Sequence, residues 1–366
     1  MRKGWDYKKL NEVCEKGASN IVINKLTDNS GEYPLFGASG LVKNIDFFHQ
    51  DKPYIGIVKD GAGVGRVNIY PAYSSLVGTM QYIFPKEGYS IDFIKYFLVK
   101  LDLSHCVSGA TIPHIYFKDY GKENIPTPSL ATQLAIVSEL DKINELIRLK
   151  KEQLKDFDNL AQSLFYEMFG DPVENEKGWD VKKLKDISRE IGDGLHGTPE
   201  YSEVDTGCYF INGNNLENGT IVIKENTKMV SEKTKAKHYI EMDDFTILVS
   251  INGTLGKVAF YNGENVILGK SACYIKLEAY NDKKYIFELL KSDYFKRYAE
   301  SECTGTTIRN VSLKSMRNFR CPLPPLPLQR LFAQRIEQIE REKSEVQKSI
   351  QDLETLLASR MQYWFE

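Results

Sequence analysis

The chain has 366 residues, which is enough for two domains of ordinary size with separate hydrophobic cores. A charged fraction of 27% and a formal net charge of −2 are typical of a globular protein. They exclude a strongly basic protein with positive charge over its whole surface, but they allow a local basic surface that binds nucleic acid. No apolar run approaches the roughly 18 residues of a membrane span, and the start MRKGWDYKKL lacks the apolar core of a signal peptide, so we expect a cytoplasmic protein.

An internal repeat organises the sequence. The opening KGWDYKKL returns as KGWDVKKL, and the later SGATI returns as TGTTI. Gln133 returns as Gln329 and Phe169 as Phe365, at one constant spacing. Between the matching ends the second copy is longer, and little aligns beyond GAGVGRV with NGTLGKV. Matching motifs at both ends, with a middle part that does not align, indicate a duplicated domain whose interior has diverged.

Each copy begins with a segment of mixed character, residues 1–128 and 178–325. Short β-type runs at 53–60, 80–84, 245–250 and 271–277 alternate with turn clusters, and helical patterns occur at 91–101 and 283–298. These patterns predict compact α+β domains of mixed α/β structure. A proline elbow, IPTPS or CPLPPLP, then fixes an extended entry into a helix of about 40 residues ending near Phe169 or Phe365. We expect helices at 129–170 and 326–366, with a linker at 171–177.

Both long helices carry apolar residues in one heptad phase, with charges between them. This pattern is typical of a coiled coil, and two helices of matching length in one chain favour pairing with each other. Packing of each helix only on its own domain is the alternative. Lys150 and Lys343 interrupt the apolar pattern. The predicted core residues are Leu140, Ile143, Ile147, Leu154, Phe157, Leu164, Ile336, Ile339, Val346, Ile350, Leu353 and Leu357.

Two segments resemble nucleotide-binding motifs without meeting their requirements. Gly269-Lys270-Ser271 ends like a phosphate-binding loop, but Glu264 stands where the first glycine belongs. IVKDGAGVGRV places Arg66 at the third glycine of a dinucleotide fingerprint and continues into a strand-like run. We interpret the second segment as a tight hairpin whose backbone can approach a ligand.

Signals for catalysis or for a metal are equally weak. The six cysteines include no Cys-x-x-Cys pair and predict free thiols, and the five histidines show no metal-ligand spacing. The chain contains no Asn/Asp-Pro-Pro-Tyr/Phe tetrad and no G-x-S-x-G elbow. Acidic pairs could still form in three dimensions, so enzymatic activity is disfavoured and not excluded.

The order of these features resembles the specificity subunits of type I restriction-modification systems, over essentially the whole chain. The matching features are the KGWDxKKL openings, SGATI and TGTTI with their proline-rich sequels, Gln133 and Gln329, and EMFGDP before the second copy. The resemblance implies two target-recognition domains joined by two long helices that form an antiparallel coiled coil, in an internal pseudo-two-fold repeat. Each recognition domain would read one half of a bipartite DNA target.

The resemblance also implies partners and cofactors. The chain would bind double-stranded DNA and serve as a scaffold for two methyltransferase subunits and for motor/nuclease subunits, in phage defence. It would carry no cofactor, because S-adenosylmethionine and Mg-ATP are expected in the partner subunits. Two other classes stay open at this stage: an enzyme with fused recognition domains, and a coiled-coil scaffold that binds no DNA.

Candidate DNA-contacting residues are polar or basic side chains in and beside glycine-rich segments, since bases and phosphates are contacted by Arg, Lys, Asn, Ser, Thr and backbone amides. His196 and Thr198 lie in DGLHGTPEY, which resembles a loop of such recognition domains. TGTT is shared between the copies, so we assign it to phosphate or scaffold contact. The full set is Lys59, Arg66, Thr111, His114, His196, Thr198, Asn252, Thr254, Lys257, Thr306, Thr307, Arg309, Asn310 and Lys314.

Overall fold

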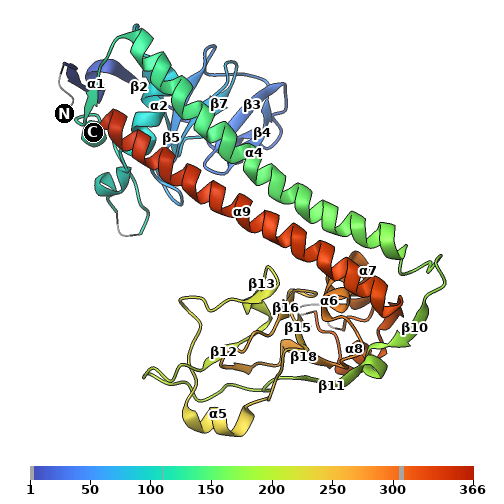
Figure 1. Ribbon diagram of the computed structural model, residues 1–366. Coiled ribbons are helices and arrows are strands. Elements are labelled where there is room, and N and C mark those ends of the chain that lie inside the picture. The colour runs from blue at the N-terminus through green and yellow to red at the C-terminus, as the bar shows by residue number, and fades with distance from the viewer. Residues whose placement is uncertain (1–3, 110, 305–308) are drawn as a thin grey trace. The chain divides into compact units, whose positions relative to one another are not determined.

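The computed structural model describes residues 4–109, 111–304 and 309–366 (Figure 1). The chain divides into two compact units: unit 1 contains Met1–Gln153 with Val346–Glu366, and unit 2 contains Leu154–Glu345. The long helices α4 (Leu130–Phe169) and α9 (Leu326–Phe365) each contribute one segment to each unit. Each contains 40 residues, which confirms the predicted helix lengths.

Unit 1 is built around a four-stranded antiparallel sheet in the order β2-β8-β5-β6. All five residues of β5 are buried, as expected for a central strand. Helix α2 packs on this sheet, and the Ser90 hydroxyl caps it by accepting from the Phe93 N–H (3.4 Å). The elements are β2 (Cys14–Ala18), β5 (Tyr54–Val58), β6 (Val67–Tyr70), β8 (Met80–Pro85) and α2 (Ile91–Lys100).

A smaller sheet, β4-β3-β7, and short helices complete unit 1. Strand β3 pairs in parallel with β7 and antiparallel with β4. These elements are α1 (Leu10–Val13), β3 (Tyr33–Gly37), β4 (Gly40–Ile45), β7 (Ser75–Leu76) and α3 (Phe117–Tyr120).

Unit 2 repeats the sheet of unit 1 in the order β11-β18-β15-β16, with α6 in the place of α2. The registers agree as well: Val249 lies opposite Cys273 as Ile57 lies opposite Gln81. The predicted strands at 53–60, 80–84, 245–250 and 271–277 are thus confirmed. The elements are β11 (Ser188–Asp193), β15 (Thr246–Ser250), β16 (Val258–Phe260), β18 (Ala272–Leu277) and α6 (Lys283–Lys291).

Two features of unit 2 differ from the expectation or from unit 1. The helix predicted at 283–298 is two helices, because Ser292 ends α6 and caps α7 by accepting from the Phe295 N–H. Most of the extra length of the second copy falls between β12 and β15, where a hairpin and α5 replace β4. The elements are β12 (Tyr209–Ile211), β13 (Leu216–Glu217), β14 (Thr220–Ile221), α5 (Glu232–His238), β17 (Val266–Leu268), α7 (Asp293–Ser301) and α8 (Leu313–Asn318).

The repeated opening motif forms a strand that pairs with the proline elbow. In unit 1 β1 (Tyr7–Lys9) pairs antiparallel with β9 (Asn124–Pro126), and in unit 2 β10 (Asp180–Lys183) pairs with β19 (Arg320–Leu323). The Trp5 ring stacks on Trp364 at 6.0 Å between centroids, whereas the Trp179 indole N–H donates to the Phe169 carbonyl (2.8 Å). The first opening therefore contacts the end of α9, and the second contacts the end of α4.

A buried glutamine attaches each long helix to its domain. The Gln133 side chain accepts from the Ser90 N–H (2.9 Å) and donates to the Pro128 carbonyl (2.9 Å). Gln329 repeats this arrangement with the Asp282 N–H (3.0 Å) and the Pro324 carbonyl (2.8 Å). Since Ser90 and Asp282 cap α2 and α6, each glutamine links the start of a long helix to the start of a domain helix.

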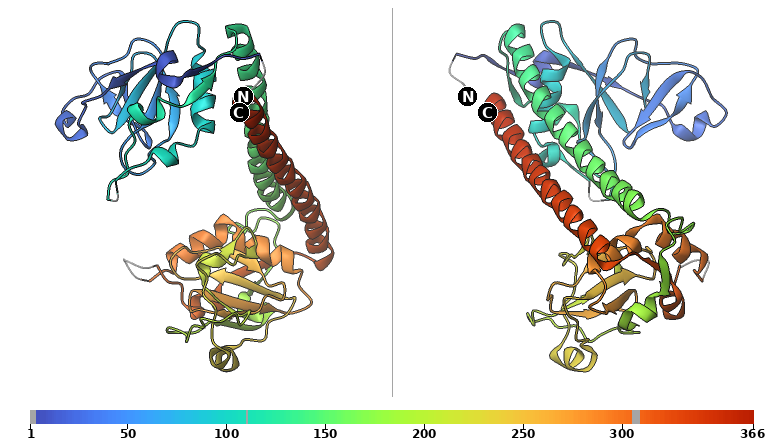
Figure 2. Two further views of the ribbon diagram at one scale, coloured as in Figure 1. Left: turned by 90° about the vertical axis from the view of Figure 1, so that its left-hand side faces the viewer. Right: turned by 45° about the vertical axis from the view of Figure 1, so that its right-hand side comes forward.

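Within each unit the segments of α4 and α9 lie side by side and run in opposite directions (Figure 2). In unit 1 the Arg360 guanidinium of α9 pairs with the Glu139 carboxylate of α4, and in unit 2 Lys343 pairs with Asp158 (2.9 Å). The helices also pack on the domains: Leu140 and Phe365 belong to the core of unit 1, and Phe165 and Phe332 belong to the core of unit 2. The two long helices thus form an antiparallel pair that is also joined to each domain.

The residues assigned to the coiled-coil core differ in burial. Leu140, Ile143, Ile147, Leu164, Ile336, Ile339, Val346 and Ile350 are buried, and Leu154, Phe157, Leu353 and Leu357 are half-buried.

In the described part of the chain, no helix combines the length and the apolarity needed to cross a membrane.

Candidate nucleic-acid interface

In unit 1 the glycine-rich hairpin between β5 and β6 is joined to the SGATI segment by backbone hydrogen bonds. The Gly61 N–H donates to the Pro113 carbonyl (2.9 Å), and the Ile115 N–H donates to the Lys59 carbonyl (2.9 Å). Ser108 and His114 exchange two further bonds of 2.9 and 2.8 Å, which close the base of the SGATI loop. Two segments far apart in sequence therefore form one edge of the domain.

Unit 2 contains the same frame. The Gly253 N–H donates to the Arg309 carbonyl (3.0 Å), and the Val311 N–H donates to the Ile251 carbonyl (2.8 Å). Thr304 and Asn310 exchange bonds of 3.0 and 3.2 Å, as Ser108 and His114 do. The repeated glycine-rich motifs thus supply a backbone connection that both units share.

Candidate residues of unit 1 lie along this frame. The Lys59 ammonium forms an ion pair with Asp60 (3.4 Å), and the His114 ring is half-buried beside Tyr116 at 5.0 Å between centroids. The exposed Arg66 guanidinium lies against Gly63, where a Cβ atom would come within 2.8 Å of it. Thr111 is exposed.

In unit 2 several candidates have partners within the protein. Lys257 lies 3.7 Å from Glu217 and Arg309 lies 3.5 Å from Glu300. The Thr254 carbonyl accepts from the Ser250 hydroxyl (2.5 Å). Lys314 and Thr198 are exposed, and the predicted contacts Thr306 and Thr307 lie outside the described residues.

Three candidates, His196, Asn252 and Asn310, meet at one hollow of about 470 Å³ in unit 2. Asp193 and Lys270, which were not among the predicted contacts, also line it. The Asp193 carboxylate is 2.7 Å from His196 Nε2, with 18% of the Asp193 side chain exposed. Lys270 is exposed, and in the described ranges its ammonium has no ion-pair partner. Sequence signals existed for both, since Asp193 opens DGLHGTPEY and Lys270 lies in GKS.

A backbone contact holds the two walls of the hollow together. The Leu195 N–H donates to the Leu268 carbonyl (2.7 Å), and the Lys270 N–H donates to the Leu195 carbonyl (3.1 Å). Gly194 permits this approach, because a Cβ atom there would lie 2.0 Å from the Leu268 oxygen. The GKS segment is therefore a turn between β17 and β18, and lacks the helix that a phosphate-binding loop requires.

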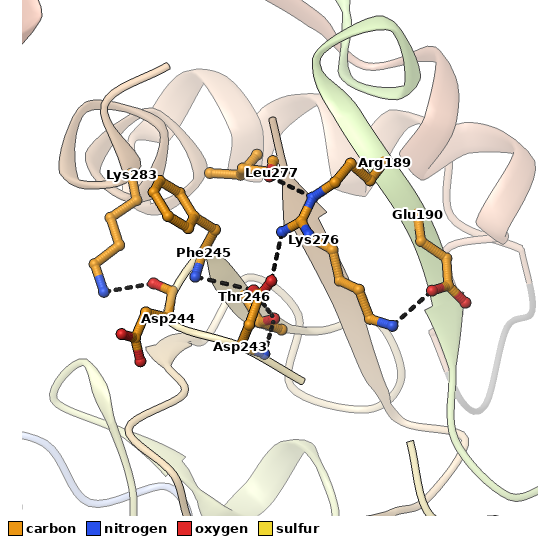
Figure 3. Close-up of polar contacts among 9 residues, drawn as sticks. All are labelled: Arg189, Glu190, Asp243, Asp244, Phe245, Thr246, Lys276, Leu277 and Lys283. Atoms are coloured by element: carbon orange, nitrogen blue, oxygen red, sulfur yellow. Dashed lines mark hydrogen bonds and ion pairs between the residues drawn. The ribbon is translucent and has the colours of Figure 1, made fainter. Parts of the chain in front are cut away.

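At the opposite end of the sheet β11-β18-β15-β16, the charged side chains form ion pairs with one another (Figure 3). There the Arg189 guanidinium donates to Asp243 (2.6 Å) and to the Leu277 carbonyl (3.1 Å), and Lys276 pairs with Glu190 (2.6 Å). Lys276 holds the pKa of Glu190 below its usual value by a hydrogen bond. These charges connect strands and loops within the domain, whereas His196 and Lys270 at the hollow are exposed to solvent.

The arrangement of the interface is suited to binding by hydrogen bonds and charge. Among residues 4–109, 111–304 and 309–366, no group of three or more His, Cys, Asp and Glu side chains could hold a metal ion. A hollow with ammonium, imidazole, amide and carboxylate groups matches the functional groups that contact nucleic-acid bases.

Known proteins of one kind resemble this chain over most of its length. It is 22% identical over 327 residues to the type I restriction enzyme MjaVIII specificity subunit of Methanocaldococcus jannaschii, covering 81% of this chain and 76% of that relative. The MjaIX specificity subunit of the same organism is 22% identical over 373 residues, covering 90% and 85% of the two chains.

Solved structures share the fold. The S subunit of a type I restriction-modification system from M. genitalium aligns with a TM-score of 0.53 at 15% identity, covering 100% of this chain and 98% of that one. A chain from a study of the assembly and conformational transition of a type I R-M system aligns with a TM-score of 0.62 at 16% identity, covering 99% and 97%.

The family model for the type I restriction modification DNA specificity domain matches residues 2–156 and again residues 176–355. The two matches together span most of the chain and follow the internal repeat. This chain therefore belongs to the family of type I restriction-modification DNA specificity proteins.

Proposed function

We propose that this chain is the DNA specificity subunit of a type I restriction-modification complex, in which each recognition domain reads one half of a bipartite duplex target. The observation that carries the proposal is the double family match on two units that share one sheet order and one set of backbone hydrogen bonds beside the glycine-rich segments. A shared frame keeps each domain in one orientation on the duplex, and different side chains let the domains read different bases.

The proposed division follows the repeat. Residues 1–128 and 178–325 are the recognition domains, 129–170 and 326–366 are the helical spacer, and 171–177 is the linker. The candidate residues outside the hollow, such as Lys59, Arg66 and Lys314, are assigned to phosphate contacts. Neutralising phosphates would make binding strongly dependent on salt.

We assign methyl transfer and DNA cleavage to partner subunits in the cytoplasm, with S-adenosylmethionine and Mg-ATP bound there. Two methyltransferase subunits fit the repeat, because equivalent positions of the two halves present equivalent surfaces. Leu160 of α4 and Leu356 of α9 are such a pair, with 50% and 45% of their surface exposed. Apolar side chains left exposed at two equivalent sites are suitable for contact with two copies of one partner.

The test is to produce this chain with its cognate methyltransferase subunit in a host free of methylation and to map N6-methyladenine across the genome. We expect a split motif with a fixed spacer that disappears when this chain is omitted. An intact complex with this chain that neither methylates nor binds duplex DNA in a salt-dependent way would contradict the proposal and favour a scaffold role.

A domain exchange tests the division into two readers. Replacing residues 178–325 with the second recognition domain of another specificity subunit should change one half of the methylated motif and leave the other half intact. A change in both halves, or in neither, would contradict independent reading by the two domains. Methyl transfer by the purified chain alone would contradict its assignment as a non-catalytic subunit.

A further inference from the structure

The positions around the hollow of unit 2 can be matched one by one with positions in unit 1. Asp193 lies opposite Cys273 and Ala18 lies opposite Gln81 in strand pairs of the same register. The Lys270 N–H donates to the Leu195 carbonyl as the Gly78 N–H donates to the Ile21 carbonyl (2.8 Å). Lys270 and Gly78 are therefore equivalent. His196 and Val22, which follow the two acceptors, are also equivalent, and unit 1 has one more residue between Ala18 and Val22 than unit 2 has between Asp193 and His196.

The two loop residues of the hollow are matched by their bridges. Asn252 pairs with Asn310, as Asp60 pairs with His114. The rim of unit 2 is thus Asp193, His196, Asn252, Lys270 and Asn310. The equivalent rim of unit 1 is Ala18, Val22, Asp60, Gly78 and His114. The identity changes at every one of the five positions, although the loop bridges and the bond donated by the Lys270 or Gly78 N–H are retained. One wall contact differs: where the Leu195 N–H donates to the Leu268 carbonyl in unit 2, the Ser19 hydroxyl donates to the Leu76 carbonyl (2.5 Å) in unit 1.

The change in chemistry is large. At the two loop positions both units carry polar side chains. At the three wall positions unit 1 carries alanine, valine and glycine, whereas unit 2 carries a carboxylate, an imidazole and an ammonium. Purely scaffolding positions would not require this difference, because the strand pairing is the same in both units. The difference is expected at positions that read different ligands.

The mixture of groups distinguishes base edges from phosphates. A phosphate site needs cations and N–H donors, and the Asp193 carboxylate would repel it. Base edges in the major groove present both donors and acceptors: a carboxylate accepts from the cytosine amino group, Lys donates to guanine, and Asn contacts adenine on two atoms. The hollow contains all three types of group.

We propose that the hollow formed by Asp193, His196, Asn252, Lys270 and Asn310 sets the base identity of the half-site read by the second recognition domain. This inference rests on the proposed function and assigns it to five residues. Asp193 is a positioning residue for His196, since their side chains are 2.7 Å apart. Its second oxygen makes no hydrogen bond within the described residues and would accept from a base amino group. Lys270 and the two asparagines provide the remaining donors and acceptors.

The test uses the full complex of this chain with its methyltransferase subunit. Lys270→Ala and His196→Ala are made separately, with Lys233→Ala as the matched control. Lys233 is on α5 of the same unit, outside the hollow, and its side chain is 86% exposed. The variants should fold normally because Lys270 and His196 are exposed. The readouts are the methylated motif across the genome and the sequences selected from a randomised duplex library by the bound complex.

We expect Lys270→Ala and His196→Ala to relax the preference at one or more positions of the second half-site by roughly 5- to 150-fold per lost contact. The first half-site and the spacer should not change, and Lys233→Ala should match the unaltered chain. Asp193→Asn should relax the same positions as His196→Ala. If a variant abolishes methylation, library selection still reports whether the second half-site is relaxed.

Three results would overturn the inference. The preference could stay unaltered in the second half-site, or change in the first. Alternatively, binding could fall equally for all sequences while its salt dependence decreases by about one ion, which is the signature of a phosphate contact. Each of these results requires that the unaltered complex still produces a split motif. Failure of that control would refute the proposed function instead.

Discussion

In unit 1 the junction between the domain and the long helices is closed by Phe93, Ile136 and Phe365, whereas Tyr285, Phe332 and Phe169 hold the equivalent places in unit 2. Two of the three residues differ in identity, yet Gln133 and Gln329 make the same hydrogen bonds beside them. Apolar packing tolerates exchanges that conserve total volume, whereas a buried hydrogen bond requires one donor and acceptor geometry. The junctions therefore share the glutamine contacts and differ in the rings around them, where the Tyr285 hydroxyl also donates to the Pro322 carbonyl (2.7 Å).

The largest expected effect comes from removing the central ring of the second junction. Phe332 is fully buried, with ring centroids of Phe169 at 5.1 Å and of Phe165 at 5.7 Å. Phe332→Ala should cost about 3–5 kcal/mol, because it leaves a cavity between rigid rings. Ile136→Ala in unit 1 should cost about 2–5 kcal/mol. Hydrogen exchange measured peptide by peptide reports the protection of each unit separately.

The control for that prediction is Val204→Ala in unit 2, since Val204 is 70% exposed and the change should cost about 0.5 kcal/mol or less. We expect Phe332→Ala to lower protection in β15 and β18, and Ile136→Ala to lower it in β5 and β8. Equal loss in both units from either variant would show that the junctions are not energetically separate.

A smaller loss of stability, of similar size in the two units, is expected when Gln133 or Gln329 is replaced. Gln329→Ala leaves the Asp282 N–H and the Pro324 carbonyl without their partner, and Gln133→Ala does the same to Ser90 and Pro128. Each substitution should cost about 1–3 kcal/mol in its own unit, the usual penalty for buried groups left unsatisfied. The same peptide-resolved exchange measurement compares the two losses.

Gln338→Ala on the exposed side of α9 is the matched control, with an expected change within about 0.5 kcal/mol. If the two glutamine variants differ by more than about 2 kcal/mol, the equivalence of the two junctions is wrong.

The same comparison explains what the sequence could predict. The long helices were recognisable because a heptad pattern over 40 residues is a strong signal, and β5 and β15 because their apolar runs are short and bounded by turns. The sheet order that the two units share could not be predicted, because the sequences between the repeated motifs scarcely align. Only the strand register shows which residues of the two units are equivalent, and the register cannot be read from a single sequence.

The candidate site was predicted in part for a related reason. Glycine-rich segments identified Asn252 and Asn310, but Asp193 and Lys270 reach the hollow through the pairing of β11 with β18 and the contact of Leu195 with Lys270. In the sequence Lys270 stands out only as part of a GKS segment whose spacing excludes a phosphate-binding loop. The break between α6 and α7 was also missed, because Ser292 inside an amphipathic run gives a weak signal.

The smallest expected effect concerns one position where the junctions differ in charge. Tyr96 of α2, six residues after the capping Ser90, donates to Asp141 (2.6 Å). Glu288 of α6 is the equivalent residue in unit 2, six residues after the capping Asp282, and 12% of its side chain is exposed. Burial raises the pKa of Glu288, and Glu340 and Asp158 act in the same direction, whereas Lys291 at 3.8 Å and Lys343 oppose the shift. The net direction is upward, so the folded state binds this proton more tightly than the unfolded state does.

A raised carboxyl pKa contributes stability that is present at low pH and is lost as pH rises through the folded pKa. Glu288→Gln should therefore stabilise unit 2 at pH 7 by about 1 kcal/mol, and this gain should disappear below about pH 4, where the unfolded carboxyl is also protonated. Tyr96→Phe should cost unit 1 about 1 kcal/mol with no pH dependence between about pH 5 and 8. Urea unfolding and hydrogen exchange as a function of pH measure both. Loss of stability in Glu288→Gln at pH 7 would mean that the attraction of Lys291 and Lys343 outweighs the cost of burial. The second junction would then be held by a carboxylate and ammonium groups at the place where the first is held by a hydrogen bond from a phenol to a carboxylate.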